Sequence, residues 1–158
     1  MSLLNKMRKT KLTAQGAAVE LLSRQGYSRI RLARKLRDKE YAEDEIEAAL
    51  NYVEEYGWLN DYEYALNLIQ SRLNRGYGAA YIRQYLRSKE IARNVIEAVF
   101  VENEWDWFVA IKKAFCKKFQ CETYEDRLRQ KYSAYLYRRG FDSELIRSFL
   151  AQTKENYS

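Results

Sequence analysis

The sequence predicts an all-α protein in which small helical repeats stack into one elongated body. Residues 26–50 recur at residues 76–100 without a gap, and ten of the 25 positions are identical. Apolar residues follow helical spacing along almost the whole chain. The 158 residues include no proline, which permits long uninterrupted helices. Because a unit this small cannot bury its apolar face alone, neighbouring units are expected to stack.

The first unit, residues 13–57, is predicted to hold three short helices. The first helix carries a stripe of alanine and leucine and ends before Gly26. Ser28 is a suitable N-cap for the second helix. In the third helix, apolar residues follow helical spacing from Ile46 onward, and Gly57 stands where a left-handed C-terminal cap belongs.

The second unit, residues 58–104, is predicted to repeat this plan. Asn60 or Asp61 can cap its first helix, with the preceding apolar pair Trp58-Leu59 folding back as a hydrophobic staple. Gly76 ends that helix. The apolar positions that define its second and third helices are Ile82, Leu86, Ile96, Val99 and Phe100.

A third, more diverged unit is predicted at residues 105–158, because residues 106–110 resemble residues 61–65. Its helices are expected to run to about Phe119, from about Tyr124 to Arg139, and from Ser143. A competing alignment matches Gly140-Phe141 with Gly76-Tyr77 and changes which helix of the unit follows this glycine. We favour three helices per unit because this count uses the whole chain.

The sequence contains no catalytic constellation. Histidine, the commonest general base and metal ligand, is absent. The only two cysteines, Cys116 and Cys121, cannot complete a zinc site without it. We expect two free thiols in a reducing cytoplasm, with one disulfide as the alternative. The carboxylates from Glu40 to Glu47 are interpreted as complementing a helix dipole. No enzymatic activity, cofactor or metal is therefore expected.

Targeting signals are also absent from the sequence. No run approaches the roughly 18–20 apolar residues of a membrane span. The N-terminal residues are basic and lack the apolar segment of a signal peptide, so residues 1–12 are predicted to form a flexible basic arm. A cytoplasmic protein without membrane contact is expected.

Charge alternates along the chain in step with the repeat, with 28 basic and 22 acidic residues in total. Residues 1–39 carry eleven basic and two acidic residues, and residues 40–69 carry nine acidic and no basic ones. Residues 70–93 are basic again, 94–110 acidic and 111–158 basic. Units stacked in parallel register would align the basic segments into a stripe. The alternative is that complementary helix faces neutralise each other between units.

The candidate partner-binding residues are cations of the basic helices. Arginine outnumbers lysine in the chain, and its planar fork suits phosphate or carboxylate recognition. Tyrosines among these cations could stack the bases of single strands, although most are expected in the core or at its rim. Tyr132, Tyr135 and Tyr137 could line one face of a helix. The predicted basic stripe consists of Arg24, Arg31, Arg34, Lys35, Arg72, Arg75, Arg83, Arg87, Arg138, Arg139 and Arg147.

Taken together, these residues resemble the bacterial RecX family, regulators of the RecA recombinase. The resemblance runs from about Leu21 to Leu150, and it is the order and spacing of short motifs that make it specific. One departure is that the first unit reads Ser28-Arg29-Ile30-Arg31-Leu32, with arginine where an acidic residue is common in the family. The matching pieces are Ser28 with Leu32 and Leu36, Gly57-Trp58-Leu59-Asn60-Asp61, Tyr64-Ala65, Arg72, Gly76, Gly78, Ile82, Leu86, Ile91, and Tyr135-Leu136-Tyr137-Arg138-Arg139-Gly140-Phe141 before Ile146.

Membership in this family implies an elongated, curved tandem array of three three-helix repeats without enzymatic activity. It implies that the basic stripe contacts RecA nucleoprotein filaments, by capping an end or lying in the groove. The consequence would be inhibition of RecA recombinase, ATPase and coprotease activities, within recombination, DNA repair and the SOS response. The alternative function is a helical repeat module that binds single-stranded or double-stranded DNA independently of RecA. A monomer is expected.

Overall fold

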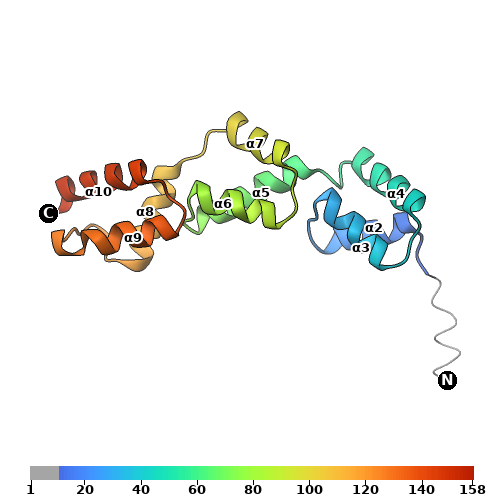
Figure 1. The fold of residues 1–158 in the computed structure, drawn as a ribbon, viewed down its shortest axis with the longest axis horizontal. Helices are drawn as coiled ribbons and strands as arrows, with labels where there is room; N and C mark the ends of the chain where they lie inside the picture. Colours follow the sequence, from blue (N-terminus) through green and yellow to red (C-terminus); the bar gives the residue numbers. More distant parts are fainter. Residues whose placement is uncertain (1–10) are drawn as a thin grey trace, which may run out of the picture. The chain divides into compact units, whose positions relative to one another are not determined.

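The computed structural model describes residues 11–158, and within them it contains nine α-helices, one 3₁₀ turn and no strand (Figure 1). The predicted all-α fold is therefore confirmed. The predicted basic arm, residues 1–12, lies outside the described part except for its last two residues. The chain forms two compact bodies, and the boundary between them lies between Tyr64 and Ala65.

The helices follow one another in three groups of three, as predicted. The first group is α2 (Ala14–Arg24), α3 (Arg29–Asp38) and α4 (Glu43–Glu55). The second is α5 (Asp61–Asn74), α6 (Ala79–Ser88) and α7 (Arg93–Glu102). The third is α8 (Trp107–Lys118), α9 (Arg129–Arg138), which the 3₁₀ turn η1 (Asp126–Leu128) precedes, and α10 (Ser143–Tyr157). The helix after Gly140 is thus the third of its group, so the competing alignment is wrong.

In the first body, α2, α3 and α4 enclose a core of small and branched apolar side chains. Helical spacing brings these residues to one face of each helix. The buried residues are Ala14, Ala17, Ala18, Tyr27, Leu32, Leu36, Ile46, Ala49, Leu50, Val53 and Leu59.

The predicted caps of the first body are confirmed. The Ser28 hydroxyl accepts a hydrogen bond from the Arg31 N–H at 3.2 Å. Gly57 has a φ of 75°, which suits a residue without Cβ. Asn60 Oδ1 accepts from the Glu63 N–H at 3.1 Å. The predicted staple is only half right, because Leu59 is buried whereas Trp58 is 50% exposed.

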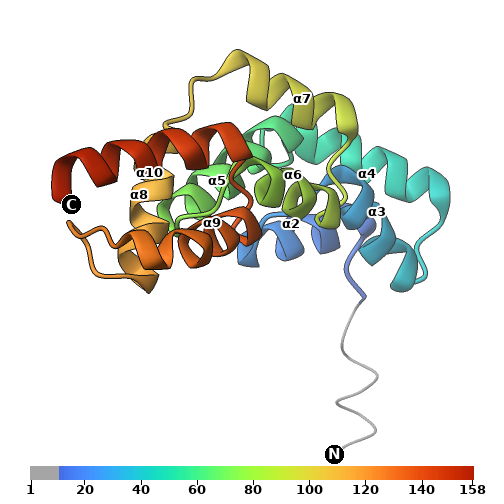
Figure 2. The same ribbon diagram turned by 60° about the vertical axis from the view of Figure 1, so that its left-hand side comes forward.

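The second body contains α5 from Ala65 onward and helices α6 to α10. In it, α9 and α10 lie side by side in both ribbon views (Figures 1 and 2). Helix α8 packs against both of them. Aromatic rings fill much of this core: Phe115, Tyr132 and Phe149 are buried and meet edge to face. Rings in this arrangement stabilise a core beyond the area that they bury.

A 50-residue period joins all three groups and fixes the register of the third. Helices α3, α6 and α9 end in the same motif, in which an amide hydrogen bond closes the last turn. These bonds run from Tyr41 N to Leu36 O, from Ile91 N to Leu86 O and from Phe141 N to Leu136 O. The residue after each helix cap has a positive φ: Glu40 (68°), Glu90 (60°) and Gly140 (99°). Spacing alone would have revealed this register, because Leu36, Leu86 and Leu136 are 50 residues apart.

The expectation of two free thiols is wrong, since Cys116 and Cys121 form a disulfide. Cys116 lies in the last turn of α8, which ends at Lys118. The chain then turns back, so the two Cα atoms are 4.6 Å apart, within the range that a disulfide spans. The predicted break between the helices near Phe119 and Tyr124 indicated a connection here, but periodicity cannot indicate that the chain turns back far enough to join the two thiols.

A membrane span requires a long apolar helix, and no helix in residues 11–158 has that combination of length and composition.

Candidate partner-binding surface

The side chains of the predicted basic stripe fall into two groups. Some are held by other residues of the protein, and others are exposed without a partner in the described part of the chain. The distinction decides which cations are available to a partner, because a paired arginine must first lose its own contact.

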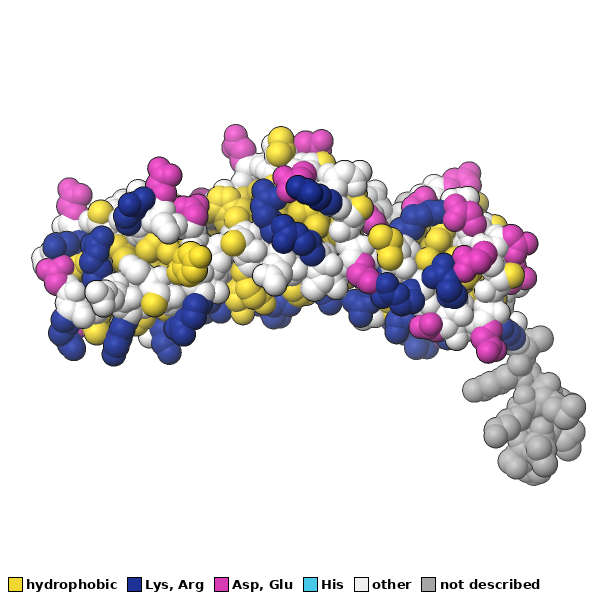
Figure 3. Space-filling model, in the orientation of Figure 1, with side chains coloured by type: hydrophobic (Ala, Val, Ile, Leu, Met, Phe, Trp, Pro, Cys, Tyr) yellow, Lys and Arg dark blue, Asp and Glu magenta, His cyan; other side chains and the backbone are white. Residues whose placement is uncertain are grey.

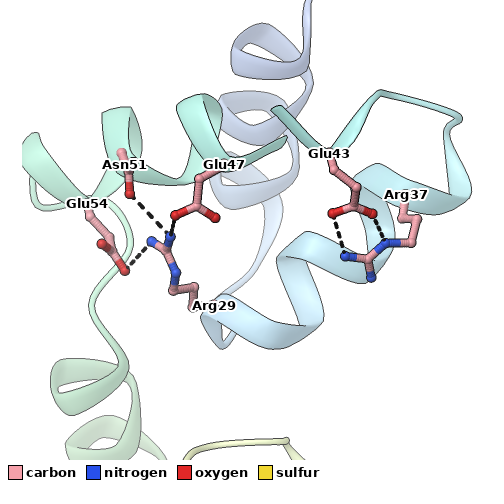
Figure 4. Close-up of polar contacts among 6 residues, drawn as sticks. All are labelled: Arg29, Arg37, Glu43, Glu47, Asn51 and Glu54. Carbon is pink, nitrogen blue, oxygen red and sulfur yellow. Dashed lines mark hydrogen bonds and ion pairs between the residues drawn. The ribbon is translucent and has the colours of Figure 1, made fainter. Parts of the chain in front are cut away.

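In the first body, ion pairs join α3 to α4 (Figure 4). The Arg29 guanidinium lies 2.9 Å from Glu47 Oε1 and 2.7 Å from Glu54 Oε1. Arg37 contacts both carboxylate oxygens of Glu43, at 2.5 and 3.0 Å. The Arg37 hydrogen bond lowers the pKa of the Glu43 carboxyl. The acidic segment thus neutralises part of the basic segment of the same repeat.

In the second repeat, an arginine at a different position also forms an ion pair between the second and third helices. Arg83 of α6 lies 2.5 Å from Glu97 of α7, and its guanidinium is 4.1 Å from the centre of the Phe100 ring. The charge pattern offers the alternative that complementary helix faces neutralise each other between units. The structure places these pairs within a repeat, between its second and third helices.

A second set of arginines is held by tyrosine rings in the second body. The Arg72 guanidinium lies 4.1 Å from the centre of the Tyr85 ring, and Nη2 donates a 2.9 Å hydrogen bond to the Tyr85 hydroxyl. This hydrogen bond raises the pKa of Arg72. Tyr77 and Tyr81 stack with their centroids 3.9 Å apart. The Arg139 guanidinium lies 3.7 Å from the centre of the Tyr77 ring, so both Tyr77 and Tyr85 have a cation over the ring.

Arg139 also ties α9 to the turn between α5 and α6. Its Nε donates a 3.1 Å hydrogen bond to the Gly76 carbonyl, and its Nη2 donates to the Arg75 carbonyl. The Gly78 N–H donates to the Arg139 carbonyl at 2.8 Å. A Cβ atom added at Gly78 would lie 2.4 Å from the Gly140 carbonyl carbon, so only glycine permits this approach. Arg72 and Arg139 therefore hold the structure together.

The remaining members of the stripe differ in exposure. Arg24 forms an exposed ion pair with Glu20 at 2.8 Å. Arg31 is half-buried, and Arg34 has an interaction within the protein. The side chains that are exposed and have no hydrogen bond or ion pair within residues 11–158 are Lys35, Arg75, Arg87, Arg138 and Arg147. We call these five the open cations.

The three tyrosines of α9 do not line one face, contrary to that sequence-based possibility. Tyr132 is buried in the core, Tyr135 is half-buried and Tyr137 is 67% exposed. Their spacing explains the difference, because residues five positions apart point to opposite sides of a helix.

Three family models match the chain in order. The first three-helix domain of RecX matches residues 14–52, the second matches residues 60–99 and the third matches residues 106–150. Each match covers one group of three helices, so the predicted tandem arrangement of three three-helix repeats is confirmed.

Curated relatives match over most of their length. The chain is 35% identical to "Regulatory protein RecX" of Vibrio vulnificus (strain CMCP6) over 141 residues, which is 89% of this chain and 92% of the relative. It is 32% identical to the protein of the same name from Haemophilus influenzae (strain PittEE) over 142 residues, covering 88% and 93%.

Solved structures share the fold. The crystal structure of RecX from Lactobacillus salivarius superposes with a TM-score of 0.74 at 20% identity, covering 90% of this chain and 95% of that one. A second crystal structure, of a regulatory protein RecX, gives a TM-score of 0.70 at 23% identity, covering 86% and 70%.

Proposed function

Because this chain belongs to the RecX family of regulatory proteins, we propose that it binds RecA nucleoprotein filaments and inhibits their recombinase, ATPase and coprotease activities. The observation that carries the proposal is the ordered match of all three RecX domains over residues 14–150. The protein acts by binding and has no catalytic step. It works as a cytoplasmic monomer in the control of recombination, DNA repair and the SOS response.

The open cations are the residues through which the protein contacts the filament. They lie in α3, in α6, in α9, in α10 and directly after α5, so every repeat supplies at least one. An arginine without an internal partner can pair with a carboxylate of RecA or a phosphate of DNA without first breaking another contact. Arg72, Arg83 and Arg139 contribute indirectly, since they hold neighbouring helices in place.

Sedimentation of RecA filaments tests the proposal. Filaments are assembled on single-stranded DNA with a slowly hydrolysed ATP analogue, and the protein is added at physiological salt. We expect it to sediment with filaments at concentrations where it does not sediment with the same DNA alone. Equal recovery with and without RecA would contradict filament binding.

Direct DNA binding independent of RecA is the second candidate function. The observation that favours it is the set of open cations, which suits phosphate as well as carboxylate. This function predicts tight binding to naked DNA with a steep dependence on salt, because neutralised phosphates release counterions.

A further inference from the structure

A groove in the third repeat has features that the basic stripe alone does not explain. Its volume is about 500 Å³, within the usual range for a ligand site. The end of α8 forms one wall and α9 forms the other. The residues that define it are Lys118, Phe119, Lys131, Tyr135, Tyr137 and Arg138.

The sequence of α9 explains how cations and rings come to share this groove. Lys131, Tyr135 and Arg138 are separated by four and three residues, which places them on one face of the helix. Lys118 and Phe119 come from the other wall, and the Cys116–Cys121 disulfide closes the turn that carries Phe119.

The groove is positively charged and has no carboxylate in its lining. Figure 3 agrees at the level of the whole repeat: Lys and Arg side chains follow its lower edge, where Figure 1 places α9, and carboxylates lie along the upper edge near α10. Three cations around a mainly apolar surface favour a ligand that is both anionic and apolar.

Two rings of the groove, Phe119 and Tyr135, pack against each other, with their centroids 5.7 Å apart. The third, Tyr137, is open, unlike the rings of the Tyr77, Tyr81 and Tyr85 row. In that row, Arg72 lies over the Tyr85 ring and Arg139 lies over the Tyr77 ring. Tyr137 is 67% exposed and has no ring or cation contact within residues 11–158. Its ring is therefore available for a planar ligand group.

We propose that this groove binds a short stretch of single-stranded nucleic acid, with a base stacked on Tyr137 and phosphates on Lys118, Lys131 and Arg138. A nucleotide supplies a flat apolar ring and an anion at a fixed spacing, which is the combination that the groove offers. An acidic peptide would pair with the cations but would leave the Tyr137 ring without a flat partner. A duplex keeps its bases stacked within the helix, so none of them is available to stack on the Tyr137 ring.

This site deepens the second candidate function and does not depend on RecA. Its test therefore uses naked strands. If strands fail to bind while RecA filaments are still inhibited, the groove proposal fails and the main proposed function stands.

The experiment is a fluorescence-anisotropy titration of a labelled oligothymidylate of about 12 nucleotides at several salt concentrations. We expect Tyr137→Ala to weaken binding by about 5- to 150-fold, the range for loss of one stacked base, and Tyr137→Phe to bind as the unmodified protein does. Lys131→Glu should weaken binding and lower its salt dependence, because one phosphate contact is lost.

Controls separate this site from general effects. Tyr157→Ala removes an exposed ring outside the groove, and Lys113→Glu reverses an exposed charge of α8 that does not line it, so both should leave binding unchanged. Unchanged binding by Tyr137→Ala would overturn the proposal. Equal competition by poly-glutamate of matched charge would also overturn it, in favour of an acidic protein partner. Circular dichroism checks that each variant is folded.

Discussion

At the scale of single residues, three glutamates of the described chain have a positive φ, at which an L-amino acid is strained, and two of them follow equivalent helix caps. Glu40 and Glu90 follow the caps of α3 and α6 with φ values of 68° and 60°, and the equivalent position after α9 is Gly140. The left-handed conformation costs a residue with a side chain roughly 1–2 kcal/mol. The 50-residue repeat therefore retains this backbone shape even where the residue does not favour it.

Glu40→Gly should raise the free energy of unfolding of the first body by up to about 1 kcal/mol, because the strain is lost while glycine adds some unfolded-state entropy. Urea unfolding followed by circular dichroism measures the change. Ala48→Gly is the matched control: this exposed position lies within α4, where glycine should cost about 1 kcal/mol. If Glu40→Gly lowered the free energy of unfolding, the contacts of the glutamate side chain would contribute more to stability than the strain of its backbone costs.

Asp61 gives the first body a distinct pH dependence. Its Oδ1 accepts a 2.9 Å hydrogen bond from the Arg29 N–H. Burial raises the pKa of the Asp61 carboxyl above its ordinary value of 3.8, and the hydrogen bond offsets only part of this. A raised folded-state pKa stabilises the fold below the unfolded value, and that contribution is lost as pH rises through the folded-state pKa.

Asp61→Asn should therefore cost more stability in acid than at pH 7, because asparagine keeps the acceptor oxygen but does not bind a proton. Urea unfolding of both proteins between pH 7 and pH 3 checks this. As the pH falls towards 3.8, the free energy of unfolding of the unmodified protein should rise relative to that of the variant. If the difference in free energy of unfolding between the two proteins became smaller in acid, the raised pKa of Asp61 would be contradicted.

At the scale of helices, the sequence predicted the caps, turns and buried positions that depend on residues close together along the chain. The Ser28 cap, the Gly57 turn and the buried Leu36 follow from local spacing and local chemistry. The contacts of Arg139 with Gly76 and Tyr77 span more than 60 residues, and no periodicity encodes them. For this reason the sequence indicates only that Arg139 belongs to the basic stripe, and the structure adds that it joins α9 to the second repeat.

Gly78→Ala tests the contact between the start of α6 and the end of α9. The added Cβ would meet the backbone of Gly140, which cannot move aside as a flexible side chain can. We expect a loss of about 2–3 kcal/mol in the free energy of unfolding, at the upper end of overpacking costs. Gly16→Ala is the control, because its nearest contact would be 3.3 Å from a threonine side chain and alanine favours a helix. Equal stability of the two variants would contradict the close approach.

Reduction of the Cys116–Cys121 disulfide should lower the stability of the second body by roughly 2 kcal/mol, because the bond closes a loop of only about six residues. Urea unfolding with and without a thiol reductant measures this. Cys116→Ser with Cys121→Ser should reproduce the reduced protein in both conditions. If the reductant still lowered the stability of the variant, the loss of stability would not come from this disulfide.

At the scale of the whole molecule, the net charge is +6, but only five of the eleven cations of the predicted basic stripe are exposed and without a hydrogen bond or ion pair within residues 11–158. Ion pairs hold Arg29, Arg37 and Arg83, and tyrosine rings hold Arg72 and Arg139. The sequence could not separate these from the open cations, because the partners come from other helices. Charge counted along the chain therefore overestimates the surface that a partner meets.

The most direct test of the central claim is the DNA-dependent ATPase activity of RecA during titration with this protein. We expect inhibition at protein concentrations well below those that coat the DNA, and we expect the charge reversal Arg87→Glu with Arg147→Glu to weaken it without unfolding the protein, since both side chains are exposed and unpaired in the described structure. Inhibition that appears only once the DNA is saturated, or that the folded double variant retains in full, would contradict regulation of the filament through the open cations.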